Sequence, residues 1–155
     1  MTDPRSILES SRAILLVDWP NTRVPRSLLQ AGFKVFGWSP NRYSQAEIMT
    51  HPSKEAGSVK VFAPNSEQEK GYLVFRPLEG CPPAVDIISV YRPADELPGI
   101  LQNHVSPLGA KVVWLLRPVQ SQRERELIAE RGLVLVEESD IAKVAGSLVE
   151  SRRAT

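Results

Sequence analysis

The chain has one cysteine, Cys81, and two histidines, His51 and His104, among its 155 residues. A single thiol excludes an internal disulfide and suits a reducing compartment. The two histidines lie far apart and neither belongs to a cysteine cluster or an HExxH pattern, so we expect no metal site. The sequence also lacks a P-loop, a GxGxxG stretch and a nucleophile elbow. With no catalytic residues to name, we expect a binding protein rather than an enzyme.

An excess of charge and long apolar runs are also missing. The 19 basic residues against 18 acidic ones leave a net charge of +1. That balance excludes the basic excess typical of proteins that bind nucleic acid or membrane surfaces. No apolar run approaches the roughly 20 residues of a membrane span, and residues 1–6 do not resemble a signal peptide. We therefore expect a cytoplasmic protein that binds neither nucleic acid nor membrane.

Short apolar runs recur along the chain, with helical patterns between them. Runs this short and rich in valine and isoleucine predict strands that are buried on both faces. Their alternation with helices predicts βαβ units and a parallel sheet. We therefore predict an α/β, Rossmann-like three-layer fold with helices on both faces, formed by residues 1–155 as a single domain. Its mainly parallel sheet would have about five strands, at residues 13–17, 33–38, 85–90, 111–116 and 132–136.

Residues 44–71 interrupt this alternation. The segment is polar and contains Pro52, Gly57 and Pro64, which disfavour continuous helix or strand. Residues 59–62 and 72–75 resemble two short strands of a hairpin. Because the segment is too short and too polar to bury a core of its own, we predict an insertion at the margin of the sheet.

Four stretches carry a family resemblance: residues 13–17, residues 31–35 with Ser39-Pro40 after them, residues 85–93, and residues 109–115. The most specific is the third, a buried strand that ends in Tyr91-Arg92-Pro93. In order and sequence these stretches resemble the small CoA-binding domain proteins related to the CoA-binding domain of the succinyl-CoA synthetase alpha subunit. The resemblance implies CoA at the carboxyl edge of the sheet, with its pyrophosphate on the first loop and helix start. Residues 39–42 would approach the nucleotide, and residues 91–93 would cover it.

The candidate ligand-binding residues follow the carboxyl ends of the predicted strands, where open α/β sheets bind ligands. Arg23 and Arg26 begin the first crossover helix and either grip phosphates or form a solvated helix end, with Arg23 paired to Asp18. Arg42 either reaches a ribose phosphate or is an ordinary exposed arginine. The full candidate set is Val17, Asp18, Trp19, Pro20, Arg23, Arg26, Ser39, Pro40, Arg42, Tyr91, Arg92 and Pro93.

Two further side-chain alternatives concern these loops. Arg92 either contacts the ligand or forms a salt bridge with Asp95 or Glu96, which lie in the first turn of the following helix. Trp19 and Trp38 either stack on an adenine or fill the edge of the core.

Asp18-Trp19-Pro20 stands where the family has a glycine-containing first loop. A carboxylate there would repel a pyrophosphate, and Pro20 has no backbone donor. Two functions therefore remain open: a module that binds CoA or a related adenine nucleotide, and a degenerate Rossmann-like scaffold or protein-interaction domain that has lost nucleotide binding. The sequence also leaves the oligomeric state open, a homodimer included.

Overall fold

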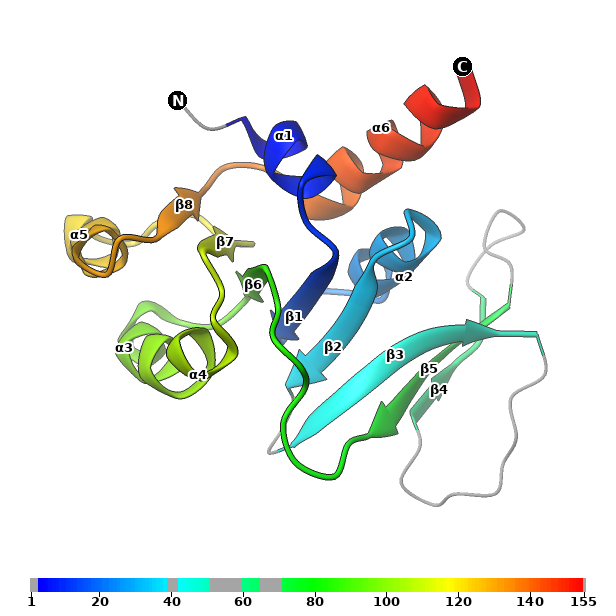
Figure 1. Cartoon of the computed structure of the whole chain (residues 1–155), viewed down its shortest axis with the longest axis horizontal. Helices are drawn as coiled ribbons and strands as arrows, with labels where there is room; N and C mark the ends of the chain where they lie inside the picture. The colour runs from blue at the N-terminus through cyan, green and yellow to red at the C-terminus, as the bar shows by residue number, and fades with distance from the viewer. Residues whose placement is uncertain (1–2, 39–41, 51–59, 65–70, 155) are drawn as a thin grey trace.

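The computed structural model describes residues 3–38, 42–50, 60–64 and 71–154 (Figure 1). Within them the chain forms one mixed sheet of eight strands in the order β4-β5-β3-β2-β1-β6-β7-β8. The five predicted strands are confirmed and pair in parallel. They are β1 (Ala13–Val17), β2 (Lys34–Trp38), β6 (Ile87–Val90), β7 (Val112–Leu115) and β8 (Val134–Val136).

Three antiparallel strands extend this sheet beyond β2, so the prediction of about five strands is wrong in number. They are β3 (Tyr43–Met49), β4 (Lys60–Phe62) and β5 (Tyr72–Pro77). The predicted hairpin is present as the β4–β5 pair, whereas β3 pairs with both β2 and β5. The part of residues 44–71 that the structure describes therefore continues the sheet. β3 is not a continuous apolar run, because only Ala46 of this strand is buried.

Helices cover both faces of the sheet, as predicted (Figure 1). One core lies between the sheet and three helices, α1 (Pro4–Glu9), α2 (Arg23–Gln30) and α6 (Ile141–Ala154). The other core lies beneath α5 (Gln122–Glu130) and a continuous helical segment. That segment consists of η1 (Ala94–Glu96), α3 (Leu97–Ile100), the π-helical η2 (Leu101–Val105) and α4 (Ser106–Leu108). No helix among the described residues has both the length and the apolarity that crossing a membrane requires.

Polar side chains set the starts of two helices. Glu124 completes a capping box at the start of α5 by accepting the backbone N–H of Ser121 at 3.4 Å. Asp140 caps α6 by accepting the N–H groups of Ala142 and Lys143 at 3.0 and 3.3 Å. The start of α5 fixes the end of the loop that follows β7, and the start of α6 fixes the end of the loop that follows β8.

The β4–β5 hairpin is fastened to the parallel part of the sheet by Trp19 and Arg26. The indole of Trp19 stacks on Phe75 at a centroid distance of 4.8 Å, and a Cβ on Gly37 would lie only 3.1 Å from that indole. The Arg26 side chain is buried, and its guanidinium donates to the carbonyls of Phe62 and Gly71 at 3.0 and 3.1 Å. A charged group thus satisfies two hairpin carbonyls beneath α2.

We expect Arg26→Met to lower the free energy of unfolding by about 1–3 kcal/mol, because two partly buried carbonyls lose charge-assisted hydrogen bonds. Urea unfolding followed by circular dichroism measures this change. Arg12→Met serves as the control, since Arg12 also lies beside a β-strand but its side chain is not among the contacts that hold the hairpin. Equal midpoints for the two variants would show that Arg26 does not fasten the hairpin.

Candidate functional site

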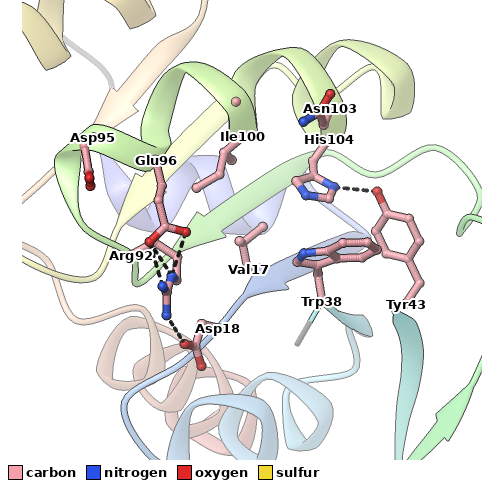
Figure 2. A pocket seen from close by; sticks show the side chains of 11 residues that line it. Val17, Asp18, Trp38, Tyr43, Arg92, Asp95, Glu96, Ile100, Asn103 and His104 are labelled. Carbon is pink, nitrogen blue, oxygen red and sulfur yellow. Dashed lines mark hydrogen bonds and ion pairs between the residues drawn. The ribbon is translucent and has the colours of Figure 1, made fainter. Parts of the chain in front are cut away.

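A cavity of about 800 Å³ opens at the carboxyl ends of β1, β2 and β6 (Figure 2). β1 and β6 are neighbours in the sheet, and the strand order changes direction between them. This is the topological switch point at which open α/β sheets bind ligands. The cavity is lined by Val17, Asp18, Trp38, Tyr43, Arg92, Asp95, Glu96, Gly99, Ile100, Asn103 and His104.

Arg92 lies at one end of the cavity between two carboxylates (Figure 2). Its guanidinium donates to Asp18 at 3.1 Å and to Glu96 at distances from 2.6 to 3.1 Å. The hydrogen bonds to Glu96 and Asp18 raise the pKa of Arg92. Asp95 is a third carboxylate in the lining, so the cavity carries a net charge of −2 when His104 is neutral. The only lining guanidinium among the described residues is already occupied by carboxylates.

The turn after β1 holds Asp18 in this position. Asp18 has a φ of 62°, in the left-handed region that aspartate tolerates better than most residues. Its backbone N–H donates to the carbonyl of Trp38 at 3.3 Å, and its carboxylate accepts the N–H of Trp19 at 2.9 Å. The carboxylate therefore closes the local turn and points its other oxygen at Arg92.

Arg117 holds the Arg92 loop through a contact with its backbone. It donates to the backbone carbonyl of Arg92 at 2.5 Å and pairs with Glu124 of α5. The side chains of Arg117 and Glu124 are 10% and 2% exposed. Burial alone would raise the pKa of Glu124, but the hydrogen bonds from Arg117 and from the backbone of Gln120 lower it. A buried ion pair thus connects the start of α5 to the loop that carries Arg92.

The other end of the cavity is aromatic (Figure 2). Trp38 packs against Tyr43 and His104 with centroid distances of 4.5 and 4.7 Å. The Tyr43 hydroxyl and His104 Nδ1 are 2.5 Å apart. Burial lowers the pKa of His104. Burial also raises the pKa of Tyr43, and the nearby Cys81 raises it further. Both side chains are therefore neutral near pH 7.

Three of the candidate residues line this cavity: Val17, Asp18 and Arg92. Tyr91 and Pro93 flank Arg92, and the side chain of Tyr91 is 40% exposed. The predicted salt bridge between Arg92 and Glu96 is present, and Asp18 pairs with Arg92 rather than with Arg23. Arg42 is exposed just before Tyr43. Ser39 and Pro40 lie outside the described residues.

The other candidates are placed elsewhere. Pro20 and Arg23 line a separate cavity of about 350 Å³ between the start of α2, the end of β7 and the loop before α6. Arg23 pairs there with Asp140 at 3.2 Å. Trp19 and Arg26 pack against the hairpin. The indole of Trp19 and the guanidinium of Arg26 therefore make their contacts within the fold.

Sequence reasoning did not assign Asn103, His104 or Tyr43 to the site. His104 shares the helical segment with Leu97, Ile100, Leu101 and Val105, and all five are buried. The signal that marks it is its polarity. A histidine within an apolar stripe beside the carboxyl edge of a sheet must find a hydrogen-bond partner when buried.

One comparison with known proteins matches most of the chain to a family. Residues 20–143 match the family described as CoA binding domain. The chain belongs to the CoA binding domain family. The matched part of this CoA binding domain begins after β1 and Asp18, within the first loop. The comparison with curated proteins gives no match.

Two solved structures share the fold of this CoA binding domain. The structure of cell-free ID.343 from Thermus thermophilus is 19% identical with a TM-score of 0.57, over 93% of this chain and 95% of that one. The crystal structure of Prb, a PH1109 protein redesigned for binding, is 17% identical with a TM-score of 0.61, over 94% of this chain and 89% of that one. At such identities the likeness shows the fold alone.

The described residues contain no group of three or more histidine, cysteine or acidic side chains that could hold a metal ion. The polar side chains that line the cavity include Arg92, Asn103 and the Tyr43–His104 pair.

Proposed function

We propose that this protein binds CoA, or a related adenine nucleotide, in the cavity at the carboxyl ends of β1, β2 and β6. The observation that carries the proposal is the position of that cavity at the switch point of a sheet whose chain belongs to the CoA binding domain family. A volume of about 800 Å³ suits a ligand of nucleotide size, since small-molecule sites commonly measure about 300–1,000 Å³.

The two ends of the cavity suit different parts of such a ligand. The aromatic end at Trp38, Tyr43 and His104 offers ring faces and edges to a planar base. At the other end Arg92 is the cation in the lining that a phosphate can approach. The ligand would therefore lie across the strand ends, with its phosphates toward Arg92.

The net negative lining sets the expected affinity. A phosphate that approaches Arg92 must compete with Asp18 and Glu96 for the same guanidinium. Pro20 and the left-handed Asp18 also replace the glycine turn that brings backbone N–H groups close to phosphate. We therefore expect a dissociation constant for CoA of about 10–100 μM rather than nanomolar.

Isothermal titration of the protein with CoA, with ADP and with pantetheine tests this proposal. We expect saturable binding of CoA and ADP, and Arg92→Met should weaken both. Arg123→Met is the matched control, because Arg123 pairs with Glu126 and Glu130 on the surface of α5, outside the cavity lining. Flat titrations with the folded protein would contradict nucleotide binding and favour the scaffold or interaction domain instead.

A further inference from the structure

Tyr43 and His104 come from distant elements and meet at the wall of the cavity. Tyr43 is the first residue of β3, and His104 lies 61 residues later in η2. His104 is only 6% exposed, yet it lines the cavity together with Tyr43 and Trp38. Figure 2 shows the Tyr43 hydroxyl on one side of the His104 ring and the second ring nitrogen turned away from Tyr43. The pair therefore leaves His104 Nε2 for another partner in the cavity.

The helix that carries His104 departs from regular α geometry at this place. Residues Leu101–Val105 form a π-helical turn, and such turns are frequent at functional sites. Pro107 has no backbone N–H, so the regular α-helical hydrogen bond to the carbonyl of Asn103 cannot form. The extra residue in the turn changes the direction in which His104 projects relative to Ile100. This segment therefore forms an irregular turn, which sets the position of His104, instead of a continuous α-helix.

The hydrogen bond to Tyr43 determines which nitrogen of His104 carries the proton. Both side chains are neutral near pH 7, because burial lowers the pKa of His104 and raises that of Tyr43. When the neutral phenol donates its O–H, the neutral imidazole accepts it at Nδ1 and carries its own proton on Nε2. In this tautomer His104 offers a hydrogen-bond donor to the cavity.

We propose that His104, oriented by Tyr43, donates a hydrogen bond from Nε2 to a ring nitrogen of the adenine base at the aromatic end of the cavity. This inference rests on the proposed function and adds which end receives the base. Ring nitrogens of adenine accept hydrogen bonds, and a base is planar enough to lie among Trp38, Tyr43 and His104. A neutral donor suits this uncharged acceptor, whereas the phosphates would lie toward Arg92. His104 is thus the residue that recognises the base, and Tyr43 is a positioning residue.

Tyr43→Phe removes the hydroxyl and keeps the ring that packs on Trp38, so it tests the pair with little change in shape. We expect the affinity for CoA and for ADP to fall about 5–10-fold, the effect of losing one oriented hydrogen bond. Pantetheine, which lacks the base, should bind the parent and the variant equally. Tyr72→Phe is the matched control, because Tyr72 lies in β5 outside the cavity lining.

Nuclear magnetic resonance of the ligand-free protein tests the proton position independently. Long-range ¹H–¹⁵N correlations should show His104 protonated at Nε2 in the parent, and a mixture of tautomers in Tyr43→Phe. A proton on Nδ1 in the parent, or an equal loss of affinity for pantetheine and ADP, would overturn this inference while leaving CoA binding intact. Absence of any binding of CoA and ADP to the parent would overturn the proposed function together with it, whatever the tautomer.

Discussion

Replacing Arg117 with methionine is expected to lower the free energy of unfolding by about 3 kcal/mol, because it leaves the buried carboxylate of Glu124 without its ion-pair partner. Glu124 is 2% exposed, so water cannot take the place of the guanidinium. Its carboxylate would keep only the backbone N–H groups of Gln120 and Ser121. The backbone carbonyl of Arg92 would also lose the hydrogen bond from Arg117. The loss is larger than for the arginines of α5 because it affects a charge that solvent cannot reach.

Chemical denaturation of the parent and of Arg117→Met measures this loss, with Arg125→Met as the matched control. Arg125 also forms an ion pair, with Glu137, but its side chain is 43% exposed. We expect the control to unfold at the parent's denaturant concentration, since exposed pairs add little stability. Arg117→Lys should fall between the two, because an ammonium cannot supply the two-pronged guanidinium contact. Equal midpoints for Arg117→Met and Arg125→Met would contradict a structural role for the buried pair.

The same pair gives the stability a dependence on pH with a defined sign. The native pKa of Glu124 is lowered, so the unfolded chain binds a proton more readily than the folded one. The contribution of the pair is therefore complete above the ordinary value of 4.5 and is lost as the pH falls through the native pKa. Arg117→Met should show a smaller loss of stability below this pH than the parent does.

The parallel half of the fold could be predicted because its strands are buried on both faces. Residues such as Leu15 and Ile88 must be apolar whatever ligand the protein binds, so their runs are visible without a structure. The starts of α5 and α6 also depend on local sequence, because a capping side chain acts on backbone groups two or three residues away. β3 does not, since its burial depends on β2 and β5 on either side rather than on its own composition.

The candidate site could likewise be predicted from the sequence only in part. The strand ends identify Asp18 and Arg92, because a parallel sheet brings its carboxyl ends to one edge. Which arginine pairs with Asp18 depends on side-chain directions that sequence order does not contain, and the partner is Arg92 rather than Arg23. The Tyr43–His104 contact joins residues 61 positions apart and depends on both β3 and a π-helical turn. Neither of these elements has a strong local signal.

Glu96→Gln is expected to strengthen CoA binding about 5–10-fold, because it removes a carboxylate that both repels phosphate and holds Arg92. The substitution keeps the length and shape of the side chain in the cavity. Arg92 would retain Asp18 as a partner and become available to a phosphate on its other edge. The change should be seen with CoA and ADP and be absent with pantetheine, which carries no phosphate.

Asp18→Asn extends the test to the second carboxylate. Asparagine tolerates the left-handed φ of 62° that this position requires, so the turn after β1 should persist. Combined with Glu96→Gln, it should lower the dissociation constant for CoA about 30-fold or more, if the two effects add on the free-energy scale. Thermal melts of each variant verify that the cavity remains folded.

Asp95→Asn separates the two causes of the gain. Asp95 lines the same cavity, but the ion pairs of Arg92 are with Asp18 and Glu96. If the total charge of the lining alone limits binding, all three single variants should improve affinity equally. We expect a smaller gain for Asp95→Asn, because only Asp18 and Glu96 compete directly with phosphate for the guanidinium. Adding Arg92→Met to the Glu96→Gln variant should then abolish the gain, and its persistence would show that the phosphate is bound elsewhere.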